Sequence, residues 1–280
     1  MSDLDLLDLA MAEVASGTRI AYLGPEVAAL SDTGAPTTPE ALCEIIEAQV
    51  RPPRRAKGNL WSVAQYVESR KFRATLDKIV RDAFDGAASG PNPVYDWLAR
   101  VRPPLVVDAW YGDGLRQAFE AATSGPKDYG LVQGVSRNGE WIDIFTRAYT
   151  RAGDEVPEVD PAWQTLLYKP HGTAAEGRSF LMSDSDYVEV LTEIDIQRPI
   201  PEEVQRRRTG RPFFFVGCRF DDQMLRIFAR QVAKRSAEGH IAVLPGPLTR
   251  MEQKFLDAMN IRRIDLPVSA IEEALSVPEG

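Results

Sequence analysis

The chain has 280 residues, which is enough to bury a large core as one big α/β domain or two modest ones. Apolar residues make up 44% of the sequence and charged residues 26%, the proportions of an ordinary soluble globular protein. With 33 basic and 41 acidic residues, the formal net charge is −8. This balance argues against broad nucleic-acid binding, which requires a net basic face.

Three further features bear on membranes, secretion and metals. No stretch of about eighteen apolar residues exists, so we expect no membrane span. The acidic start Met1–Asp5 lacks the basic residues that open a signal peptide. The two cysteines, Cys43 and Cys218, are far apart and form neither a CxxC metal knuckle nor a disulfide framework. We therefore expect a cytoplasmic protein without a metal site.

The first half of the chain is predicted to be mainly helical, with two strands. In chain order we expect a helix over 4–14, a strand over 19–23, a helix over 39–50, two helices within 61–84, a helix over 94–101 and a strand starting at 105–107. Thr38 is the expected N-cap of the second helix, with Pro39 in its first turn. Residues 51–57 form a basic, proline-rich loop, and about 58–101 form a helical insertion.

The second half alternates strands with helices. Leu131–Ser136 and Trp141–Thr146 are predicted to pair as a hairpin, because Asn138-Gly139 lies between them. We then expect strands over 165–168, 213–216, 240–244 and 262–266, helices over 183–194, 223–236, 252–258 and 270–275, and a polar, basic segment over 199–211. This alternation predicts one Rossmann-like α/β domain over 1–280, with a mostly parallel sheet, helices on both faces and a small β-hairpin.

The most informative local feature is the tetrad Lys169-Pro170-His171-Gly172, which follows a predicted strand. Glycines also follow two other predicted strands, at Gly24 and Gly217. Ligands of open α/β sheets bind beyond the carboxyl ends of the strands, so these positions are candidates for one site. The only other histidine, His240, precedes a predicted strand, and position alone does not decide between the two.

In their order, these segments resemble the sirtuin-like superfamily, specifically its zinc-free bacterial branch, which includes defence NADases. The resemblance covers about Arg19 to Leu275. The family's Gly-Ala-Gly-x-Ser loop and Gly-x-Pro turn correspond to Gly24-Pro25-Glu26-Val27-Ala28 and Gly34-Ala35-Pro36. Its Thr-x-Asn-Tyr-Asp segment corresponds to Asp108-Ala109-Trp110-Tyr111-Gly112. Its Lys-x-His-Gly tetrad is Lys169 to Gly172, and its Gly-x-Ser segment is Gly217-Cys218-Arg219.

The resemblance implies a cofactor site and a catalytic residue. It makes His171 the family's general base. It implies that NAD or a related nucleotide is the candidate cofactor, with no zinc. The corresponding cofactor-binding positions are Gly24, Pro25, Glu26, Gly34, Trp110, Gly217, Cys218 and Arg219.

Several of these positions depart from the family pattern. Glu26 replaces the second glycine of a loop whose backbone amides approach the NAD pyrophosphate, and Ala28 replaces a serine. Trp110 stands at the family asparagine, and Arg219 at a ribose-side serine. Because positioning supplies much of the rate of such a reaction, a lone histidine without an oriented cofactor is a poor catalyst.

These departures favour a sirtuin-like pseudoenzyme, a non-catalytic module that binds a nucleotide or another ligand or has a regulatory role. The alternative is an NAD-hydrolysing enzyme that uses His171, with Asp108 or Asp113 in place of the missing asparagine. A third option is a subunit whose site a second protein completes. The residues also allow structural explanations, namely a turn histidine at 171, turn glycines at 24 and 217, and core packing for Trp110 and Tyr111.

The charged segments raise two further expectations. Glu26 would form an ion pair with Arg219 if both line one cleft. The basic segments at 51–57 and 206–211 are expected to be solvated, although a basic run also suits an acidic partner. We expect a protein partner or a homo-oligomer, and neither nucleic acid nor membrane.

Overall fold

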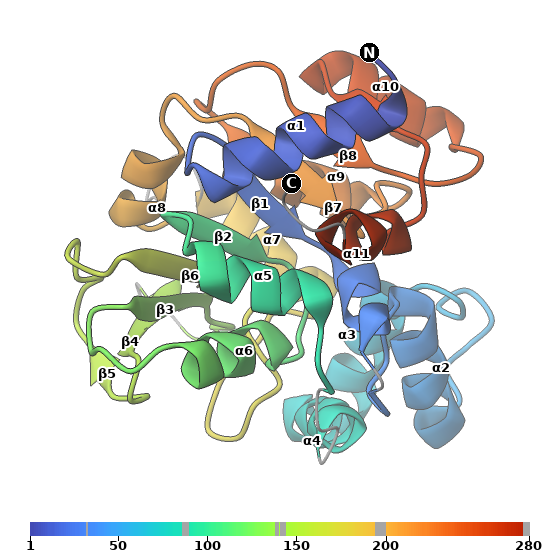
Figure 1. Ribbon diagram of the computed structural model, residues 1–280. Helices are drawn as coiled ribbons and strands as arrows, with labels where there is room; N and C mark the ends of the chain where they lie inside the picture. Colours follow the sequence, from blue (N-terminus) through green and yellow to red (C-terminus); the bar gives the residue numbers. More distant parts are fainter. Residues whose placement is uncertain (32, 86–89, 138–139, 141–143, 194–199, 277–280) are drawn as a thin grey trace.

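A single β-sheet organises the computed structural model, which describes residues 1–31, 33–85, 90–137, 140, 144–193 and 200–276 (Figure 1). Within these residues the sheet has nine strands in the order β5-β4-β3-β6-β2-β1-β7-β8-β9. The strands are β1 (Ile20–Leu23), β2 (Leu105–Asp108), β3 (Tyr129–Gly134), β4 (Thr146–Thr150), β5 (Glu155–Val156), β6 (Thr165–Lys169), β7 (Phe213–Val216), β8 (Ile241–Val243) and β9 (Arg262–Ile264).

The sheet is mostly parallel, as predicted. Seven neighbouring strands, from β3 to β9 in the order given, run parallel, and β4 and β5 add an antiparallel edge. Ala21 of β1 is in register with Val106 of β2 on one side and Phe214 of β7 on the other. In the sheet, β2 lies on one side of β1, whereas β7, β8 and β9, which come later in the chain, lie on the other side. A ligand crevice is therefore expected beyond the carboxyl ends of these central strands.

Helices cover both faces of the sheet (Figure 1). One face carries α1 (Asp3–Ala15), α5 (Pro93–Val101), α6 (Gly114–Ala122) and α11 (Ser269–Ser276). The other face carries α2 (Pro39–Val50), α3 (Leu60–Lys71), α4 (Arg73–Phe84), α7 (Asp184–Glu193), α8 (Glu202–Arg208), α9 (Gln223–Ala233) and α10 (Arg250–Met259). None of the helices within the described ranges is both long and apolar enough to cross a bilayer.

The strand residues divide between the two cores with a period of two. Ile20 and Tyr22 of β1 pack under α2 and its neighbours, whereas Ala21 and Leu23 pack on the other face. Successive side chains of a strand point to opposite faces, so a strand buried on both sides is apolar throughout. This is why short continuous apolar runs were sufficient to predict the central strands.

The helix ends follow local capping chemistry. Thr38 caps α2 by accepting a hydrogen bond from the amide of Ala41, with Pro39 at the first position, as predicted. The predicted pair of helices within 61–84 is also confirmed, because α3 and α4 are separated at Phe72. Phe72 has a φ of 71° and is 81% exposed, so it forms an abrupt corner rather than part of the core.

Two of the sequence-based expectations differ from the structure. The antiparallel pair consists of β3 and β4, with Gly134 opposite Thr146. The second strand was predicted to end at Thr146, but in the structure it begins there. Ile144 and Phe145 are not strand residues, although the amide of Val135 donates to the Phe145 carbonyl and holds the loop together. The Asn138-Gly139 turn and residues 141–143 lie outside the described residues, as does 194, the last residue of the predicted helix over 183–194.

The basic segment near residue 206 is the second difference. It forms α8, and the side chains of Arg207 and Arg208 are buried rather than solvated. Arg207 donates to the carbonyls of Pro104 and Trp163, and Arg208 to those of Gln231 and Val232. Unpaired carbonyls at strand and helix ends are costly when buried, so these guanidinium groups stabilise the ends of neighbouring elements. The arginines in the 51–57 loop, in contrast, are exposed.

Candidate functional site

The turn after β1 packs directly against the turn after β7. The amide of Gly24 donates to the carbonyl of Val216, and the amide of Glu26 donates to that of Gly217. A Cβ on Gly24 would overlap the Gly217 carbonyl oxygen, and one on Gly217, whose φ is 64°, would lie 2.7 Å from the nitrogen of Val27. Both positions therefore require glycine for close backbone approach. The amide that would face a phosphate in such a loop is already bound to protein.

The charged residues beside these turns do not form the expected ion pair. Arg219 instead pairs with Glu252 at 2.9 Å and donates to the carbonyl of Pro245. Glu26 is half-buried in the 3₁₀ helix η1 (Pro25–Leu30). Burial raises the pKa of its carboxyl, and the positive charge of Arg219 opposes that rise. The structure thus assigns Arg219 to the cap of α10 rather than to a shared cleft with Glu26.

Cys218 and Gly34 complete the predicted cofactor-binding set. The Cys218 side chain is buried, its thiol faces the carbonyls of Val216 and Tyr22, and burial raises its pKa. A thiol that stays protonated is a weak nucleophile. Gly34 is exposed in the loop before α2, and no atom lies within 4 Å of the Cβ that a substitution would add.

Lys169 is the anchor of the carboxyl end of β2. Its Nζ lies 2.6 Å from Oδ2 of Asp108 and 2.7 Å from the carbonyl oxygens of both Trp110 and Gly112. The side chain is almost fully buried. Burial raises the pKa of the Asp108 carboxyl, and the charge of Lys169 opposes that rise. Three acceptors satisfy the three donors of one ammonium group, so Lys169 fixes the path of the chain through Trp110 and Tyr111.

His171 lies two residues further on and is enclosed by aromatic rings. Its Nδ1 is 2.9 Å from the hydroxyl of Tyr187, and its ring centroid is 4.6 Å from that of Phe228. Nε2 is buried and has no hydrogen-bond partner among the described residues. Burial, together with the nearby charge of Lys169, lowers the pKa of His171 to about 3. The imidazole is therefore neutral at physiological pH.

The space beside His171 is small. It measures about 20 Å³, which is room for about one water molecule. Its walls are aromatic and aliphatic, without a carboxylate; they comprise Pro25, Pro39, Leu60, Trp61, Ala109, Trp110, Tyr111, Tyr187 and Leu225 together with His171. We call this space the histidine cavity. Trp110 and Pro25, two predicted cofactor-binding residues, thus meet His171 there.

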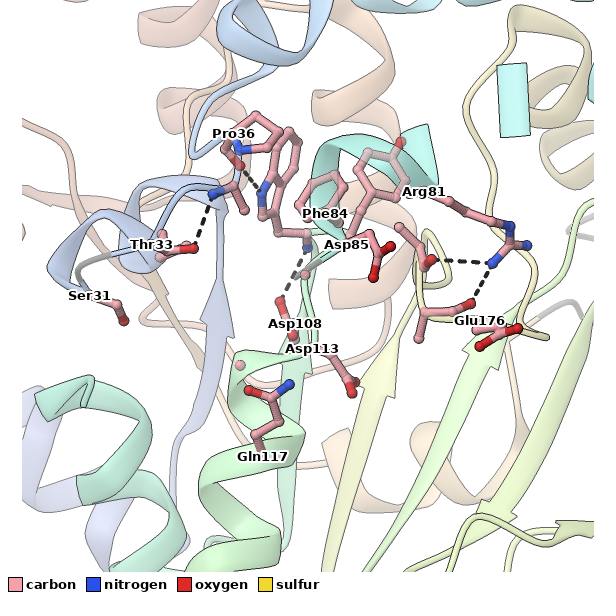
Figure 2. Close-up of a pocket in the computed structure, with 18 of the residues that line it drawn as sticks. Ser31, Thr33, Pro36, Arg81, Phe84, Asp85, Asp108, Asp113, Gln117 and Glu176 are labelled. Atoms are coloured by element: carbon pink, nitrogen blue, oxygen red, sulfur yellow. Dashed lines mark hydrogen bonds between the residues drawn. The ribbon is translucent and has the colours of Figure 1, made fainter. Parts of the chain in front are cut away.

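A much larger cavity of about 620 Å³ opens beside the carboxyl end of β2 (Figure 2). We call it the acidic cavity. Its walls come from the loop before α2, from α4, α5 and α6, and from residues 174–176. Five carboxylates line it, namely Asp82, Asp85, Asp108, Asp113 and Glu176. A volume of this size lies within the range of small-molecule sites.

Trp110 and Tyr111 line both cavities and separate them. The indole Nε1 of Trp110 donates to the carbonyl of Pro36 at 2.9 Å, and the hydroxyl of Tyr111 donates to that of Leu181 at 2.7 Å. Both rings are buried, with centroids 5.1 Å apart. The partition is therefore held at both ends by hydrogen bonds. His171 lies on one side of it, and the larger volume lies on the other.

Sequence reasoning identified the residues at the strand ends but missed most of the acidic cavity. Asp108 and Asp113 were proposed as substitutes for the family asparagine, and the structure places both in this cavity. Asp85, Tyr95 and Glu176 come from three segments that only the tertiary structure brings together. No local pattern in the sequence marks them.

The sheet order, the helices on both faces and cavities beyond the carboxyl ends of β1, β2 and β6 define a Rossmann-like α/β protein. A family model described as SIR2-like domain matches residues 104–264, which is more than half of the chain, and the chain belongs to that family. The matched segment runs from the start of β2 to the end of β9 and contains Trp110, His171 and Gly217. The turn at Gly24 lies before it. A search of curated proteins finds no match to this chain.

Proposed function

We propose that this chain is a SIR2-like module that binds a small ligand in the acidic cavity and does not cleave NAD through His171. The enclosure of His171 carries this proposal. A general base must come within hydrogen-bond reach of the proton that it removes. A space of about 20 Å³ beside the ring admits a water molecule but no nucleotide.

The protonation state of His171 supports the same conclusion. An imidazole with a pKa of about 3 is a weak base, because proton transfer is efficient when the pKa lies near the working pH. Tyr187 holds Nδ1, and Phe228 packs on the ring. The histidine thus serves as a buried packing and hydrogen-bonding residue at the end of β6.

The turn at Gly24 supports a lost pyrophosphate site. The amide of Glu26 is bonded to Gly217, and the Glu26 side chain adds a carboxyl group beside it. NAD or a related nucleotide would have to separate these two turns before its phosphates met backbone amides. The cavity that is open lies elsewhere, beyond the partition of Trp110 and Tyr111.

Nicotinamide release at high enzyme concentration tests the proposal. We expect the wild-type chain and His171→Ala to give the same background rate. His240→Asn is the matched control, since His240 accepts a hydrogen bond from the Phe213 amide and lines neither cavity. Turnover by the wild type that disappears in His171→Ala and persists in His240→Asn would overturn the proposal.

The second candidate is an NAD-hydrolysing enzyme that uses His171. The buried Nε2, which has no partner in the part of the chain that the structure describes, favours it, because that atom would be free to accept a proton once a ligand reached it. It requires Trp110 and Tyr111 to leave their positions. Both aspartates that were considered as substitutes for the asparagine already form ion pairs. Asp108 binds Lys169, and Asp113 pairs with Arg116 at 2.7 Å. The same assay separates the two candidates.

A further inference from the structure

We propose that the ligand of the acidic cavity is an organic cation with a flat or aromatic body. This inference rests on the proposed function, because it names the ligand class of the same cavity. The argument uses the charge of the lining, the orientation of its one arginine, the aromatic wall and the hydroxyl of a tyrosine in that wall.

The charge of the lining is strongly negative. Five carboxylates face the cavity, against a single basic residue, Arg81. The Arg81 guanidinium donates to the carbonyls of Ala174, Ala175 and Arg178, so three of its five N–H donors bind the loop that forms one wall. Figure 2 shows Arg81 turned to the carbonyls of Ala174 and Ala175, and it shows Asp85, Asp108 and Asp113 around the central hollow. Most of the hydrogen bonds of this arginine are therefore made to the protein, and the carboxylates outnumber it in the cavity wall.

The carboxylates differ in how far they are neutralised. Asp108 is paired with Lys169, Asp113 with Arg116 and Asp82 with Lys78. Asp85 and Glu176 form no ion pair within the described part of the chain, and both are exposed at the cavity rim. Two uncompensated negative charges at the entrance of a cavity attract a cation and repel an anion.

One wall of the cavity is aromatic. The rings of Phe84 and Trp110 lie 6.0 Å apart at an interplanar angle of 66°, and Trp110 packs on Tyr111. Aromatic faces carry partial negative charge and attract organic cations, most strongly where water is excluded. A flat cation can contact this aromatic wall and keep its charged end toward the carboxylates.

The hydroxyl of a tyrosine in the cavity wall points to a ligand independently of the charges. Tyr95 of α5 lines the cavity with only 5% of its surface exposed. In the ranges that the structure describes, its hydroxyl has no hydrogen-bond partner. Burial, and after it the negative charge of Asp108, raises the pKa of Tyr95, and both residues line the cavity. A tyrosine hydroxyl can donate and accept a hydrogen bond, so this group has the capacity to bind a ligand.

Two other ligand classes fit less well. A phosphate would meet several carboxylates, and the repulsion between like charges would oppose its binding. Metal binding lacks a ligand set, because no group of three or more His, Cys, Asp or Glu side chains in the described segments is placed to hold an ion. An organic cation is the class that satisfies the charge, the aromatic wall and the hydroxyl together.

A matched series of three probes tests the inference on the full chain. Benzamidine, benzamide and benzoate share one ring and carry positive, neutral and negative charge. We expect calorimetric titration to show benzamidine binding at least about fivefold more tightly than benzamide, an advantage that shrinks at high salt, and no benzoate binding. Equal affinities, tighter benzoate binding or no benzamidine binding would each overturn the inference.

Two variants test whether the probes bind in the acidic cavity, and a third variant is a control. Asp85→Asn should weaken benzamidine binding severalfold and leave benzamide unchanged, whereas Tyr95→Phe should weaken both. Asp8→Asn, on the exposed side of α1 and away from the cavity, should change neither. If benzamidine binds to Asp85→Asn and to Tyr95→Phe as tightly as to the wild type, it binds outside this cavity and the inference fails.

The cation inference and the proposed function can fail independently of each other. If a nucleotide binds the cavity and Phe84→Ala abolishes that binding, the module still binds a ligand and only the cation class is wrong. If NAD is cleaved in a way that requires His171, the proposed function fails whatever the probes show.

Discussion

The two cavities at the carboxyl ends of β6 and β2 share a wall but differ in size and chemistry. The histidine cavity measures about 20 Å³ and is lined by aromatic and aliphatic side chains around His171. The acidic cavity measures about 620 Å³ and is lined by five carboxylates. His171, the general base that the resemblance implies, lies on the side without space for a ligand, and the larger cavity contains no histidine among its lining residues. A retained motif residue therefore does not show where a ligand binds.

Lys169 determines how firmly the wall between the cavities is held, and its loss should have the largest effect. Lys169→Met leaves the buried Asp108 carboxylate without its partner and releases the carbonyls of Trp110 and Gly112. We expect a loss of about 3–5 kcal/mol in the free energy of unfolding, measured by urea denaturation.

The control is a surface lysine. Lys127 pairs with Asp160 but is 60% exposed, so Lys127→Met should change stability by less than about 1 kcal/mol. Equal effects of the two variants would show that the Lys169 pair is worth no more than a surface pair and that the wall does not depend on it.

Removing the indole should abolish the difference between the two cavities. Trp110→Ala joins the histidine cavity to the acidic cavity, because Trp110 lines both. It should cost about 3 kcal/mol or more in stability. It should also admit water to His171 and raise its pKa from about 3 toward the ordinary 6.5, as followed by NMR of the imidazole protons.

Phe84→Ala is the matched control for that experiment. Phe84 contacts Trp110 from the acidic side and does not line the histidine cavity. This variant should enlarge only the acidic cavity and leave the His171 pKa low. A raised pKa in both variants would contradict the view that Trp110 itself closes the space.

Acid should destabilise the protein through His171. The unfolded chain binds a proton at this residue below about pH 6.5, whereas the folded chain does not until about pH 3. Its contribution is therefore fully present above pH 6.5 and is lost progressively as the pH falls toward 3. Between pH 7 and pH 5 it should cost roughly 2 kcal/mol.

The variant His171→Gln isolates this contribution, because it cannot titrate. Its unfolding free energy should fall less than that of the wild type between pH 7 and pH 5, by roughly the same 2 kcal/mol. Parallel pH profiles for the two proteins would mean that His171 is solvated and that the histidine cavity is open.

The smallest expected effect concerns the corner that joins α3 and α4. α3 contributes Trp61 to the histidine cavity, and α4 contributes Phe84 to the acidic cavity. Phe72 between them has a φ of 71° and is 81% exposed, so its side chain gains little from packing. Phe72→Gly should stabilise the protein by about 1 kcal/mol, measured by urea denaturation, without changing probe binding. A loss of stability would indicate that the exposed ring is packed in solution.

The strands were predictable because each is buried on both faces. Runs such as 213–216 have no polar residue, and α/β alternation then implies their parallel order. The strand pairing after Gly134 was less predictable, because a loop of eleven residues, rather than the Asn-Gly turn alone, separates the paired positions 134 and 146. The carbonyls that bury Arg207 come from segments about 40 and 100 residues away, so local composition could not show that this basic run is internal.

The site was predictable only where it follows the strand ends. Trp110, His171 and Gly217 each follow a strand, and Trp110 and His171 line the same cavity, but their roles as cofactor-binding or catalytic residues stay predictions. Asp85 and Tyr95 could not be foreseen, because their positions depend on how α4 and α5 pack. The sequence also could not show that Arg219 pairs with Glu252 rather than with Glu26, because the position of Arg219 in the chain does not reveal which carboxylate lies beside it in the fold.

The close contact of Gly24 with Gly217 has a consequence for how this chain could change over generations of mutation. Replacing Glu26 with glycine removes a side chain but leaves the backbone amide bonded to the Gly217 carbonyl. Any larger residue at Gly24 or Gly217 would force the two turns apart before a ligand was there to fill the gap. No single substitution thus leads gradually from the packed turns to a phosphate-binding loop. A phosphate-binding loop at this position would require several coordinated substitutions. The first of them would lower the stability of the fold without increasing the affinity for a ligand.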